Sequence, residues 1–490
     1  MCVCVCRLRN EIFMQRYIFL YTAALMMTVG TYIAKGQNPD IKRTYHWYFG
    51  NQAGLDFNNC VVSADTNSIM VAEEGSASIS DTLGNLLFYT DGDTVWNKNH
   101  QPMPNGTGLM GCWSSMQSAL IVPKPTNFFS YYLFTTDCAE NNGTLGLRYS
   151  VVDMNLAGGL GDVIQKNIPL IAPVHEQLSA IKHNNKTDIW VMTHKRDEDK
   201  FYAYFVTSSG IDTVPIITNI GNSATLPYGA YSMKFSPNGK KLVAGNIWDW
   251  SNTGAMDTVD LYDFDNSTGI LSNRIKLIPD TAFASFEFSP DNSKLYIIAG
   301  YMAGVRVYQY DLNASNIELS KYKIAEIPPL YYLGAQISPD KGKIYISRLD
   351  KDTMAVINNP NAFGNACNFV ELGIPLNGRK CLYGLPNFLR SYFDADTNNC
   401  ITSENEILEV GSEITIYPNP FSKFAIAEWI NNNHNTTEIT IFDFFGKSIS
   451  QIKTEKSQVI IERHGLSAGI YILKIQTQDK IFVRKLILTN

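Results

Sequence analysis

Short hydrophobic runs separated by turn residues recur along the first four-fifths of the chain. The clearest unit is an apolar run that ends in Ser-Pro and continues through Asn or Asp to lysine and a second apolar run; it occurs at 235–243, 288–296 and 337–345. Proline fixes φ at the first turn corner, and Asn, Asp or Gly accepts the geometry that reverses the chain. Each copy is therefore predicted to be a β-hairpin.

These hairpins repeat at an interval that indicates a ring of sheets. The three clear copies lie about 50 residues apart, which is close to the period of propeller repeats. Weaker copies stand at 79–89, 121–134 and 181–191, and a second kind of strand pair falls between hairpins at 149–160, 261–271 and 307–313. Two hairpins in each period make four strands, which is one propeller blade.

The predicted fold is all-β, a seven-bladed β-propeller over residues 37–393 followed by a small Ig-like β-sandwich over residues 413–490. Residues 370–393 are expected to form the seventh blade, and the segment that begins at Trp47 is expected to add a strand to it and close the ring. An open pair of sandwiches is the alternative, but it does not explain the period. The polar stretch 394–412 is predicted to be a linker.

The N-terminus has the pattern of an export signal. Arg16 precedes an apolar run, and Ala34 and Gly36 are small residues at the −3 and −1 positions of a cleavage site. The run is shorter than the ~20 residues that span a bilayer, so we expect a signal peptide over residues 1–36 and no transmembrane span in the mature chain. An uncleaved anchor is the alternative. Met14 starts a better signal than Met1.

Composition narrows the partners of the mature chain. A chain of 490 residues is too long to fold around a single hydrophobic core, so at least two domains are expected. The formal net charge is −6 with no basic run, which disfavours nucleic acid.

Cysteines raise the question of disulfides. Of the nine cysteines three lie in the leader, and the other six are Cys60, Cys112, Cys138, Cys367, Cys381 and Cys400. An exported chain favours disulfides. Cys367 and Cys381 are the favoured pair because they are close in sequence, with free buried thiols as the alternative. No zinc-type spacing occurs, and the sequence predicts no metal and no cofactor.

Propeller ligands usually meet one face of the ring, built from the loops that lead into each blade and the loops after each second strand. Aromatic, acidic and histidine side chains that the predicted hairpins place on this face suit a glycan or a peptide. The candidate ligand-binding residues are Trp96, Trp113, Asp137, His175, His194, Trp248, Trp250 and Tyr301. For each residue taken alone, packing or turn capping is the favoured interpretation.

An enzyme would need an acid and a base on that face. Glu73, Glu74, Asp137, His175 or His194 could serve. No G-x-S-x-G, HExxH, P-loop or dinucleotide motif connects them. Hydrolase or lyase activity is therefore kept as an alternative to binding, and a structural or adhesive surface role as a third hypothesis.

Several motifs of the C-terminal region occur in order up to the end of the chain. Residues 417–420 read Tyr-Pro-Asn-Pro, 445–447 read Phe-Gly-Lys, and 465–475 begin with Gly-Leu-Ser-Ala-Gly. This region closely resembles the type A C-terminal sorting domain of the type IX secretion system of Bacteroidetes. The residues that carry the resemblance are Tyr417, Pro418, Asn419, Pro420, Gly465, Gly469, Tyr471 and Lys485.

The resemblance implies an Ig-like sandwich that the outer-membrane translocon recognises and that is removed during surface attachment or release. The implied partners are the translocon and sorting machinery, and the implied location is the outer cell surface or the medium, reached through the periplasm. The larger region also resembles a group of exported Bacteroidetes propellers, through residues 47–50, 86–92 and 384–388. That second resemblance implies a fold and no reaction. The sequence thus predicts an exported propeller that binds a glycan or peptide.

Overall fold

The structure is a computed structural model, and two compact units divide it, Met1–Ile401 and Thr402–Asn490. It describes residues 39–59, 61–127, 129–221, 231–246, 259–277, 283–299, 304–327, 334–340, 342–394, 414–429, 436–443, 447–463, 465–477 and 481–489. The predicted signal peptide lies outside these ranges. Within them, no helix has both the length and the hydrophobicity needed to cross a membrane.

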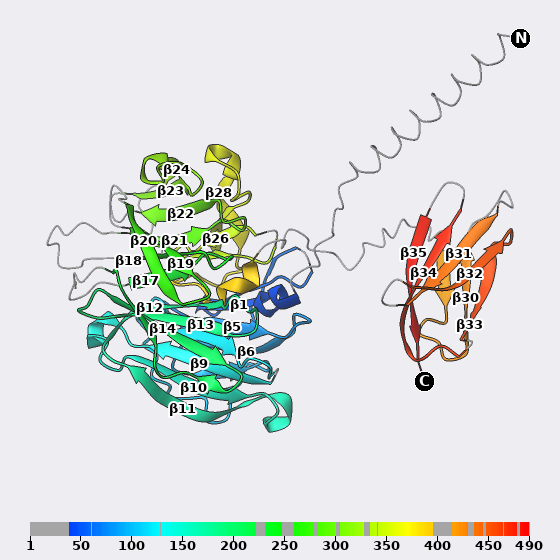
Figure 1. The fold of residues 1–490 in the computed structure, drawn as a ribbon, viewed down its shortest axis with the longest axis horizontal. Helices are drawn as coiled ribbons and strands as arrows, with labels where there is room; N and C mark the ends of the chain where they lie inside the picture. The colour runs from blue at the N-terminus through cyan, green and yellow to red at the C-terminus, as the bar shows by residue number, and fades with distance from the viewer. Residues whose placement is uncertain are drawn as a thin grey trace, which may run out of the picture. The chain divides into compact units, whose positions relative to one another are not determined.

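Seven antiparallel sheets form the described part of the first unit (Figure 1). The first contains β1 (His46–Asn51), β2 (Ala53–Asp56), β3 (Ser63–Ala64) and β4 (Val71–Ala72); the second contains β5 (Ala77–Ser80), β6 (Leu86–Thr90) and β7 (Val95–Asn97). The third contains β8 (Ala119–Pro123), β9 (Ser130–Thr136), β10 (Leu147–Asp153) and β11 (Asp162–Ile171). The fourth contains β12 (Val174–Lys182), β13 (Ile189–Lys195), β14 (Lys200–Thr207), β15 (Gly210–Ile211) and β16 (Ile216–Asn219).

Three further sheets repeat the same four-strand order. They are β17 (Tyr231–Phe235), β18 (Lys241–Asn246), β19 (Val259–Asp265) and β20 (Ile270–Leu277); β21 (Phe283–Phe288), β22 (Lys294–Ala299), β23 (Val305–Asp311) and β24 (Tyr322–Ile327); and β25 (Ala335–Ile337), β26 (Ile344–Ile346), β27 (Thr353–Ile357) and β28 (Phe369–Pro375). Short 3-10 turns are η1 (Pro39–Thr44), η2 (Ala139–Asn141), η3 (Ala157–Gly159), η4 (Glu318–Ser320), η5 (Gly364–Cys367) and η6 (Arg390–Phe393).

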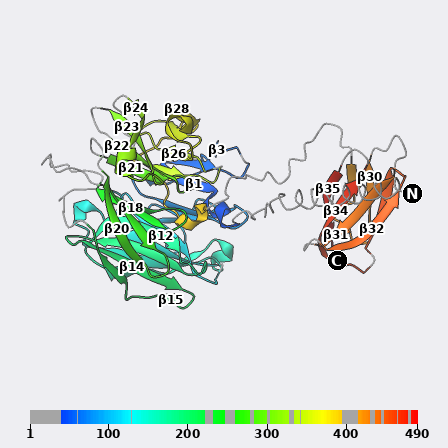
Figure 2. The same cartoon turned by 45° about the horizontal axis from the view of Figure 1, so that its top comes forward.

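The first strands of neighbouring sheets contact one another, which is the arrangement of propeller blades around an axis. These contacts run from β5 to β8, β12, β17, β21 and β25 in turn. Figure 2 shows the same sheets after a turn about the horizontal axis. The all-β propeller predicted from the repeats is confirmed.

The Ser-Pro hairpins form for the reason that their sequence suggests. In the first copy the Ser236 hydroxyl donates to Asn238 Oδ1 over 2.8 Å and accepts from the backbone N–H of Lys241 over 2.9 Å. Gly239 has φ +66°, a left-handed conformation that glycine adopts without strain. Ser289 repeats the pattern with Asp291 and Lys294. The serine therefore closes each turn from inside.

The ring closes differently from the prediction. The N-terminal segment does not add a strand to the last blade: it forms its own sheet, and β25–β28 is complete without it. Val370 already belongs to β28, the last strand of that blade, where it pairs with Val356, and the described residues after β28 add no further strand to this sheet. They return to the N-terminal sheet instead, where Asn51 bridges Lys380.

This return segment, residues 380–387, occupies the gap between the last blade and the second sheet. Ser347 donates its hydroxyl to the carbonyl of Tyr383 over 2.9 Å, and the N–H of Asn387 donates to the carbonyl of Ser76 over 2.8 Å. Trp47 completes the closure, because its ring lies 5.9 Å from that of Tyr345. The two ends of the propeller thus meet through backbone bonds and aromatic packing.

The second unit is a two-sheet sandwich. One sheet has the order β29 (Ile414–Tyr417), β30 (Phe424–Trp429) and β33 (Gln458–Glu462). The other has the order β32 (Ser448–Thr454), β31 (Thr437–Phe442), β34 (Gly469–Gln476) and β35 (Ile481–Leu488). Ala425, Ala427 and Trp429 alternate with exposed or half-buried residues of β30 and face an apolar core. The predicted small sandwich is confirmed.

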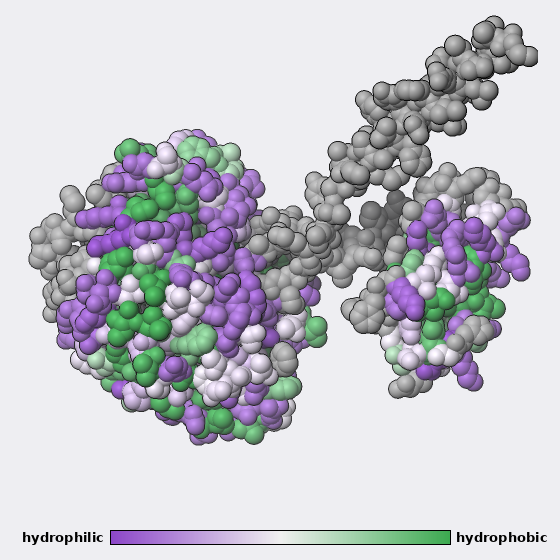
Figure 3. All heavy atoms as spheres, viewed as in Figure 1, coloured by the Kyte–Doolittle hydropathy of each residue, from purple (hydrophilic) through white to green (hydrophobic). Residues whose placement is uncertain are grey.

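Apolar side chains also reach the surface of the propeller on its outer strands. Ile164 in β11, Ile217 in β16 and Ile270 in β20 are examples. Figure 3 shows hydrophobic and hydrophilic residues interspersed on the face toward the viewer. Isolated apolar residues of this kind are normal on a soluble surface.

Candidate functional site

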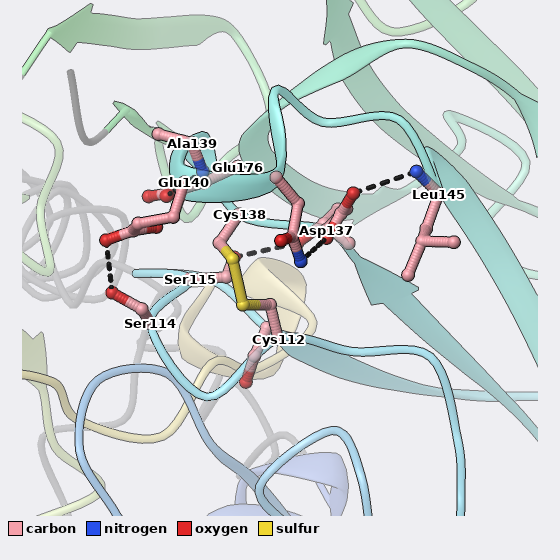
Figure 4. Close-up of a disulfide and its surroundings, with 12 residues drawn as sticks. Cys112, Ser114, Ser115, Asp137, Cys138, Ala139, Glu140, Leu145 and Glu176 are labelled. Atoms are coloured by element: carbon pink, nitrogen blue, oxygen red, sulfur yellow. Dashed lines mark hydrogen bonds between the residues drawn. A yellow bond between two sulfur atoms is a disulfide. The ribbon is translucent and has the colours of Figure 1, made fainter. Parts of the chain in front are cut away.

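Three glutamates from separate parts of the chain lie around the loop that leads into β8, the first strand of the third sheet. Glu176 in β12 is only 1% exposed, and its carboxylate accepts the N–H of Ala139 over 3.0 Å and the N–H of Met116 over 3.2 Å. Glu140 accepts the hydroxyl of Ser114 over 2.8 Å (Figure 4). Glu74 precedes β5 and interacts electrostatically with both of the others. Glu74, Glu140 and Glu176 are called the acidic cluster below.

Glu74 is the unusual member of the acidic cluster. Its Oε2 is shielded from solvent and has no hydrogen-bond partner among the described residues. Burial raises the pKa of this carboxyl well above its ordinary value, and the neighbouring charge of Glu176 raises it further. Glu74 therefore keeps its proton to a higher pH than an ordinary glutamate, while Glu176 is held by two backbone donors.

A disulfide fixes the loop beside the acidic cluster. Cys112, before β8, is bonded to Cys138, after β9, with their Cα atoms 5.4 Å apart. Asp137 lies next to these sulfurs, but it accepts Asn141 Nδ2 and the N–H of Leu145 over 3.0 and 2.8 Å, which are turn-closing bonds (Figure 4). Disulfide sulfurs lack the thiolate form that binds metals, so these three residues are not a metal site in this state.

The predicted Cys367–Cys381 disulfide is wrong, because both residues are free and buried. Cys367 packs in the core between the last two blades, whereas Cys381 belongs to the core around the N-terminal sheet. The extended strand β28 separates them and carries the chain roughly 3.3 Å per residue from one core to the other. Closeness in sequence was therefore misleading. Cys60 and Cys400 lie outside the described residues.

His175 and His194 lie together inside the fourth blade. Their rings stack with centroids 5.5 Å apart, and each residue is 4% exposed. Burial lowers the pKa of both imidazoles, that of His194 to about 4 and that of His175 well below its ordinary value. Both are thus neutral at ordinary pH, and the rings of Phe201 and His194 make an edge-to-face contact with their centroids 4.5 Å apart. This environment supports packing rather than direct ligand contact.

The predicted aromatic residues separate into two kinds. Trp96 is half-buried and stacks on Tyr89 with centroids 5.5 Å apart, which is a packing role. Trp113 is 64% exposed and lies between Cys112 and Ser114, on the loop that the disulfide fixes. Trp248, Trp250 and Tyr301 lie outside the described residues. Trp113 is therefore the exposed member of the predicted aromatic residues that the structure describes.

A small pocket of about 30 Å³ lies at the N-terminal ends of the inner strands. Its wall comes from the loop before β8, from β17, β21 and β25, and from the return segment. Met116 connects this wall to the acidic cluster, since its N–H binds Glu176. Gly384, another wall residue, lies against the backbone of Glu74. A Cβ at position 384 would fall 1.9 Å from the carbonyl oxygen of Glu74, so the position excludes a side chain.

Lys234 lines this pocket and belongs to a buried ionic network. Its Nζ donates to Glu287 Oε2 over 2.9 Å, to Gln336 Oε1 over 3.3 Å and to the carbonyl of Ala335. Burial lowers the pKa of Lys234 to about 8, partly offset by Glu287. Arg390 binds both carboxylate oxygens of Glu287, and its Nε donates to the carbonyl of Phe235 over 3.0 Å.

Glu287 remains ionised inside this network. Burial alone would raise the pKa of its carboxyl, but the charges of Arg390 and Lys234 outweigh burial and lower it. Sequence reasoning did not select these residues, although a signal exists. Lys234, Glu287 and Gln336 each stand two residues before the serine of a Ser-Pro turn. A polar residue at that repeat position points to the axis, where the three copies meet.

The sorting-motif residues occupy turns and strands of the second unit. The hydroxyl of Tyr417 donates to Glu428 over 2.7 Å, and Asn419 Oδ1 accepts the N–H of Ile487 over 2.8 Å. The peptide bonds before Pro418 and Pro420 are cis. Gly465 has φ +76° and Gly469 φ +159°, and Tyr471 after them is buried in the core. Lys485 lies in β35, opposite Ile472.

Comparison with known protein families matches residues 415–489 to the family described as the secretion system C-terminal sorting domain. No curated protein matches the chain.

Among solved structures, PorZ of Porphyromonas gingivalis, described as an essential bacterial surface component of the type IX secretion system, is 10% identical with a TM-score of 0.37. The match covers 92% of this chain and 60% of that one, so this chain spans less than two thirds of the PorZ length. A putative 6-phosphogluconolactonase from Bacteroides fragilis is 13% identical, with a TM-score of 0.36 and coverage of 77% and 94%. The periplasmic gluconolactonase PpgL of Pseudomonas aeruginosa is 11% identical, with a TM-score of 0.37 and coverage of 71% and 89%.

Structural similarities at this level do not indicate a shared activity. The family match, in contrast, confirms the resemblance that the C-terminal motifs carry. This chain is thus a β-propeller protein with a type IX secretion sorting domain at its C-terminus, exported to the cell surface or secreted.

Proposed function

We propose that the propeller is a binding module whose ligand, a glycan or a peptide, meets the face formed by the Trp113 loop and the acidic cluster. The observation that carries the proposal is the exposure of Trp113 on a fixed loop. The Cys112–Cys138 disulfide and the bond from Ser114 to Glu140 restrain that loop on both sides of the indole. A large aromatic plane held in place loses little entropy on binding.

The acidic cluster supports the same assignment. A shielded carboxyl oxygen without a hydrogen-bond partner destabilises a fold, and Oε2 of Glu74 has none among the described residues. Perturbed carboxyl groups of this kind gather at functional sites. The destabilising group lies on the loops that lead into the blades, beside the exposed indole.

A capture experiment tests this proposal. The full-length protein is screened on glycan and peptide arrays, and the wild type is compared with Trp113→Ala. We expect the substitution to weaken capture at least about tenfold, the typical consequence of removing a central aromatic anchor. Phe129→Ala is the matched control, because Phe129 is also an exposed aromatic residue, 54% accessible, on the turn between β8 and β9.

Unchanged capture by Trp113→Ala, or an equal loss in both variants, would contradict this site. No capture by the wild type on either array would favour the structural or adhesive alternative.

A second candidate function is hydrolysis or elimination. Its supporting observation is that Glu74, whose carboxyl pKa is raised by burial and by Glu176, interacts with Glu176, whose carboxylate two backbone N–H groups bind. General acid and base catalysis uses two carboxyl groups in different environments. Mass analysis of ligand recovered after incubation tests it. Catalysis predicts shortened or modified ligand, and Glu74→Gln should then stop conversion while capture persists. Intact ligand from the wild type would contradict it.

For export, we propose that residues 1–36 are removed, that residues 37–393 form the functional propeller, and that the linker 394–412 joins it to the sorting domain at 413–490. Fusing residues 394–490 behind a signal peptide and an inert reporter should carry the reporter to the surface in a host with type IX secretion. Retention of the reporter in the periplasm would contradict this division.

A further inference from the structure

Trp113 is held beside an exposed carboxylate. The hydroxyl of Ser114, the next residue along the chain, donates to Glu140 over 2.8 Å (Figure 4), and Glu140 is exposed to solvent. Trp113 is itself 64% exposed. A ligand that reaches the indole ring therefore also meets the negative charge of Glu140.

A second acidic segment lies against the same loop. The N–H of Gly75 donates to the carbonyl of Ser115 over 2.9 Å, and the two residues before Gly75 are Glu73 and Glu74. Glu73 is exposed, whereas Oε2 of Glu74 is shielded and has no hydrogen-bond partner among the described residues. Burial raises the pKa of Glu74, and the charges of the neighbouring glutamates raise it further. These carboxyl groups are therefore close enough to interact.

A third acidic segment contacts the start of the loop. The N–H of Gly111 donates to the carbonyl of Gly92 over 3.0 Å, and Gly92 lies between Asp91 and Asp93. The carboxylate of Asp91 accepts the N–H of Asp93 over 2.9 Å, which closes the turn. Asp93 is exposed. The turn thus holds a further carboxylate at the surface next to the loop.

Basic side chains on neighbouring segments do not cancel this charge. Three of them donate to carbonyl or amide oxygens of the protein, namely Arg148, Lys166 and Arg196. Against these three cations stand five carboxyl groups with ordinary surroundings or backbone donors, namely Glu73, Asp93, Asp137, Glu140 and Glu176. The described charges around the Trp113 loop are therefore negative on balance.

An exposed indole beside carboxylates is suited to a cation. The face of an aromatic ring attracts the side chain of lysine or arginine, and tryptophan attracts it most strongly. Carboxylates near the ring add charge-assisted hydrogen bonds to the same cation. A neutral glycan would stack on the ring but would bring no charge to match the carboxylates, so the electrostatics favour a basic peptide.

We propose that the Trp113 loop binds a basic peptide, with a lysine or arginine side chain over the indole and with Glu140 and Glu73 as its anionic partners. The inference rests on the proposed binding function and names its ligand class. It selects the peptide over the glycan because the loop combines an aromatic face with negative charge.

Titration of the full-length protein with three probes tests the inference. The probes are a capped peptide of alternating glycine and lysine, the same peptide with acetyllysine in place of lysine, and the neutral glycan cellohexaose. We expect the lysine peptide to bind at least about tenfold more tightly than the acetyllysine peptide, because acetylation removes the charge and keeps the aliphatic chain. Added salt should weaken binding of the lysine peptide and hardly affect the other probes.

Variants locate the binding. Trp113→Ala should reduce affinity for the lysine peptide at least about tenfold, and Trp113→Phe should reduce it less, because a smaller ring keeps part of the attraction. Glu140→Gln should reduce it several-fold, since the amide loses the charge while its oxygen can still accept from Ser114. This variant decides the question if Trp113→Ala fails to fold. Glu318→Gln, which removes an exposed carboxylate from η4, is the control and should bind as the wild type does.

Equal affinity for the lysine and acetyllysine peptides would overturn the inference, and so would affinity for the lysine peptide that is unchanged in both Trp113→Ala and Glu140→Gln. Tighter binding of cellohexaose than of the lysine peptide, lost in Trp113→Ala, would overturn the ligand class and leave the proposed function standing. Absence of peptide binding together with absence of capture on the arrays would contradict both.

Discussion

The interiors of the two units differ in kind. In the sandwich, the described buried side chains are apolar apart from Thr437 and Thr440, and its ion pair between Lys453 and Glu438 lies at the surface. In the propeller, Glu287, Arg390 and Lys234 are enclosed together near the axis. Burying charges is costly unless each is paired.

The difference corresponds to what each unit does. A sorting domain is recognised through its surface, so an apolar core that keeps the domain folded is sufficient for its role. The propeller instead encloses charged groups on its inner strands, where Glu287 is paired with Lys234 and Arg390. Four predictions test the contrast, from the largest expected effect to the smallest.

Arg390→Met should have the largest effect on the propeller. It leaves the buried carboxylate of Glu287 with Lys234 as its remaining charged partner, which should lower the free energy of unfolding by about 3–5 kcal/mol. Urea denaturation followed by tryptophan fluorescence measures it. Lys453→Met in the sandwich is the control and should change stability little, since exposed pairs contribute little. Comparable losses in the two variants would remove the contrast.

Replacing both cysteines of the disulfide, Cys112→Ser with Cys138→Ser, should lower propeller stability by about 3.5 kcal/mol. The bond joins residues separated by 26 positions, and the figure follows from the loop entropy that the crosslink removes from the unfolded chain. Reductant should lower the stability of the wild type in the same way and leave the double variant unaffected. A wild type that is insensitive to reductant would argue against the bond.

The histidine pair should make the propeller sensitive to acid. Because burial lowers the pKa of His194 to about 4 and also lowers that of His175, the folded state resists protonation that the unfolded state accepts. The contribution of His194 to stability should be constant above about pH 6.5 and should fall as pH drops toward 4, by up to about 3 kcal/mol.

His194→Phe should reduce this loss, as measured by thermal unfolding across the pH range. An unchanged acid profile in the variant would show that other groups cause the loss.

Glu74→Gln should produce a small gain. The folded pKa of Glu74 is raised by burial and by Glu176, so the native carboxyl opposes ionisation and stability falls as pH rises above the unfolded value near 4.5. The amide removes that penalty and should stabilise the propeller by roughly 1 kcal/mol at pH 7 and hardly at all at pH 4. Equal effects at both pH values would mean that ionisation of Glu74 does not cost stability, and so that its pKa is not raised in the folded protein.

Much of the fold is predictable because the repeat is carried by local turn chemistry. Ser236 and Ser289 close the same turn through the same bonds, and a period near 50 residues then indicates a blade. Ring closure was not predictable in this way. Whether residues 380–387 or the segment from Trp47 fill the last gap depends on long-range pairing, which local propensities do not encode.

The site was predictable in part. The hairpin assignment placed the Trp113 loop and residues 135–137 on one face, and the disulfide joins these regions through Cys112 and Cys138. Closeness in sequence suggested Cys367 and Cys381 instead, because distance along the chain does not tell which loops the propeller brings together. Lys234, Glu287 and Gln336 share a repeat position that the alternation of residues reveals. Arg390 follows the last blade, and no repeat predicts its contact with Glu287.

The most direct test of the central claim is hydroxyl-radical footprinting of the full-length protein with and without a ligand that the arrays capture. The account predicts that oxidation of Trp113 falls when ligand is bound, while oxidation of Phe129, on the turn between β8 and β9, stays the same. Protection of Phe129 or of another surface, with Trp113 still fully reactive, would contradict it.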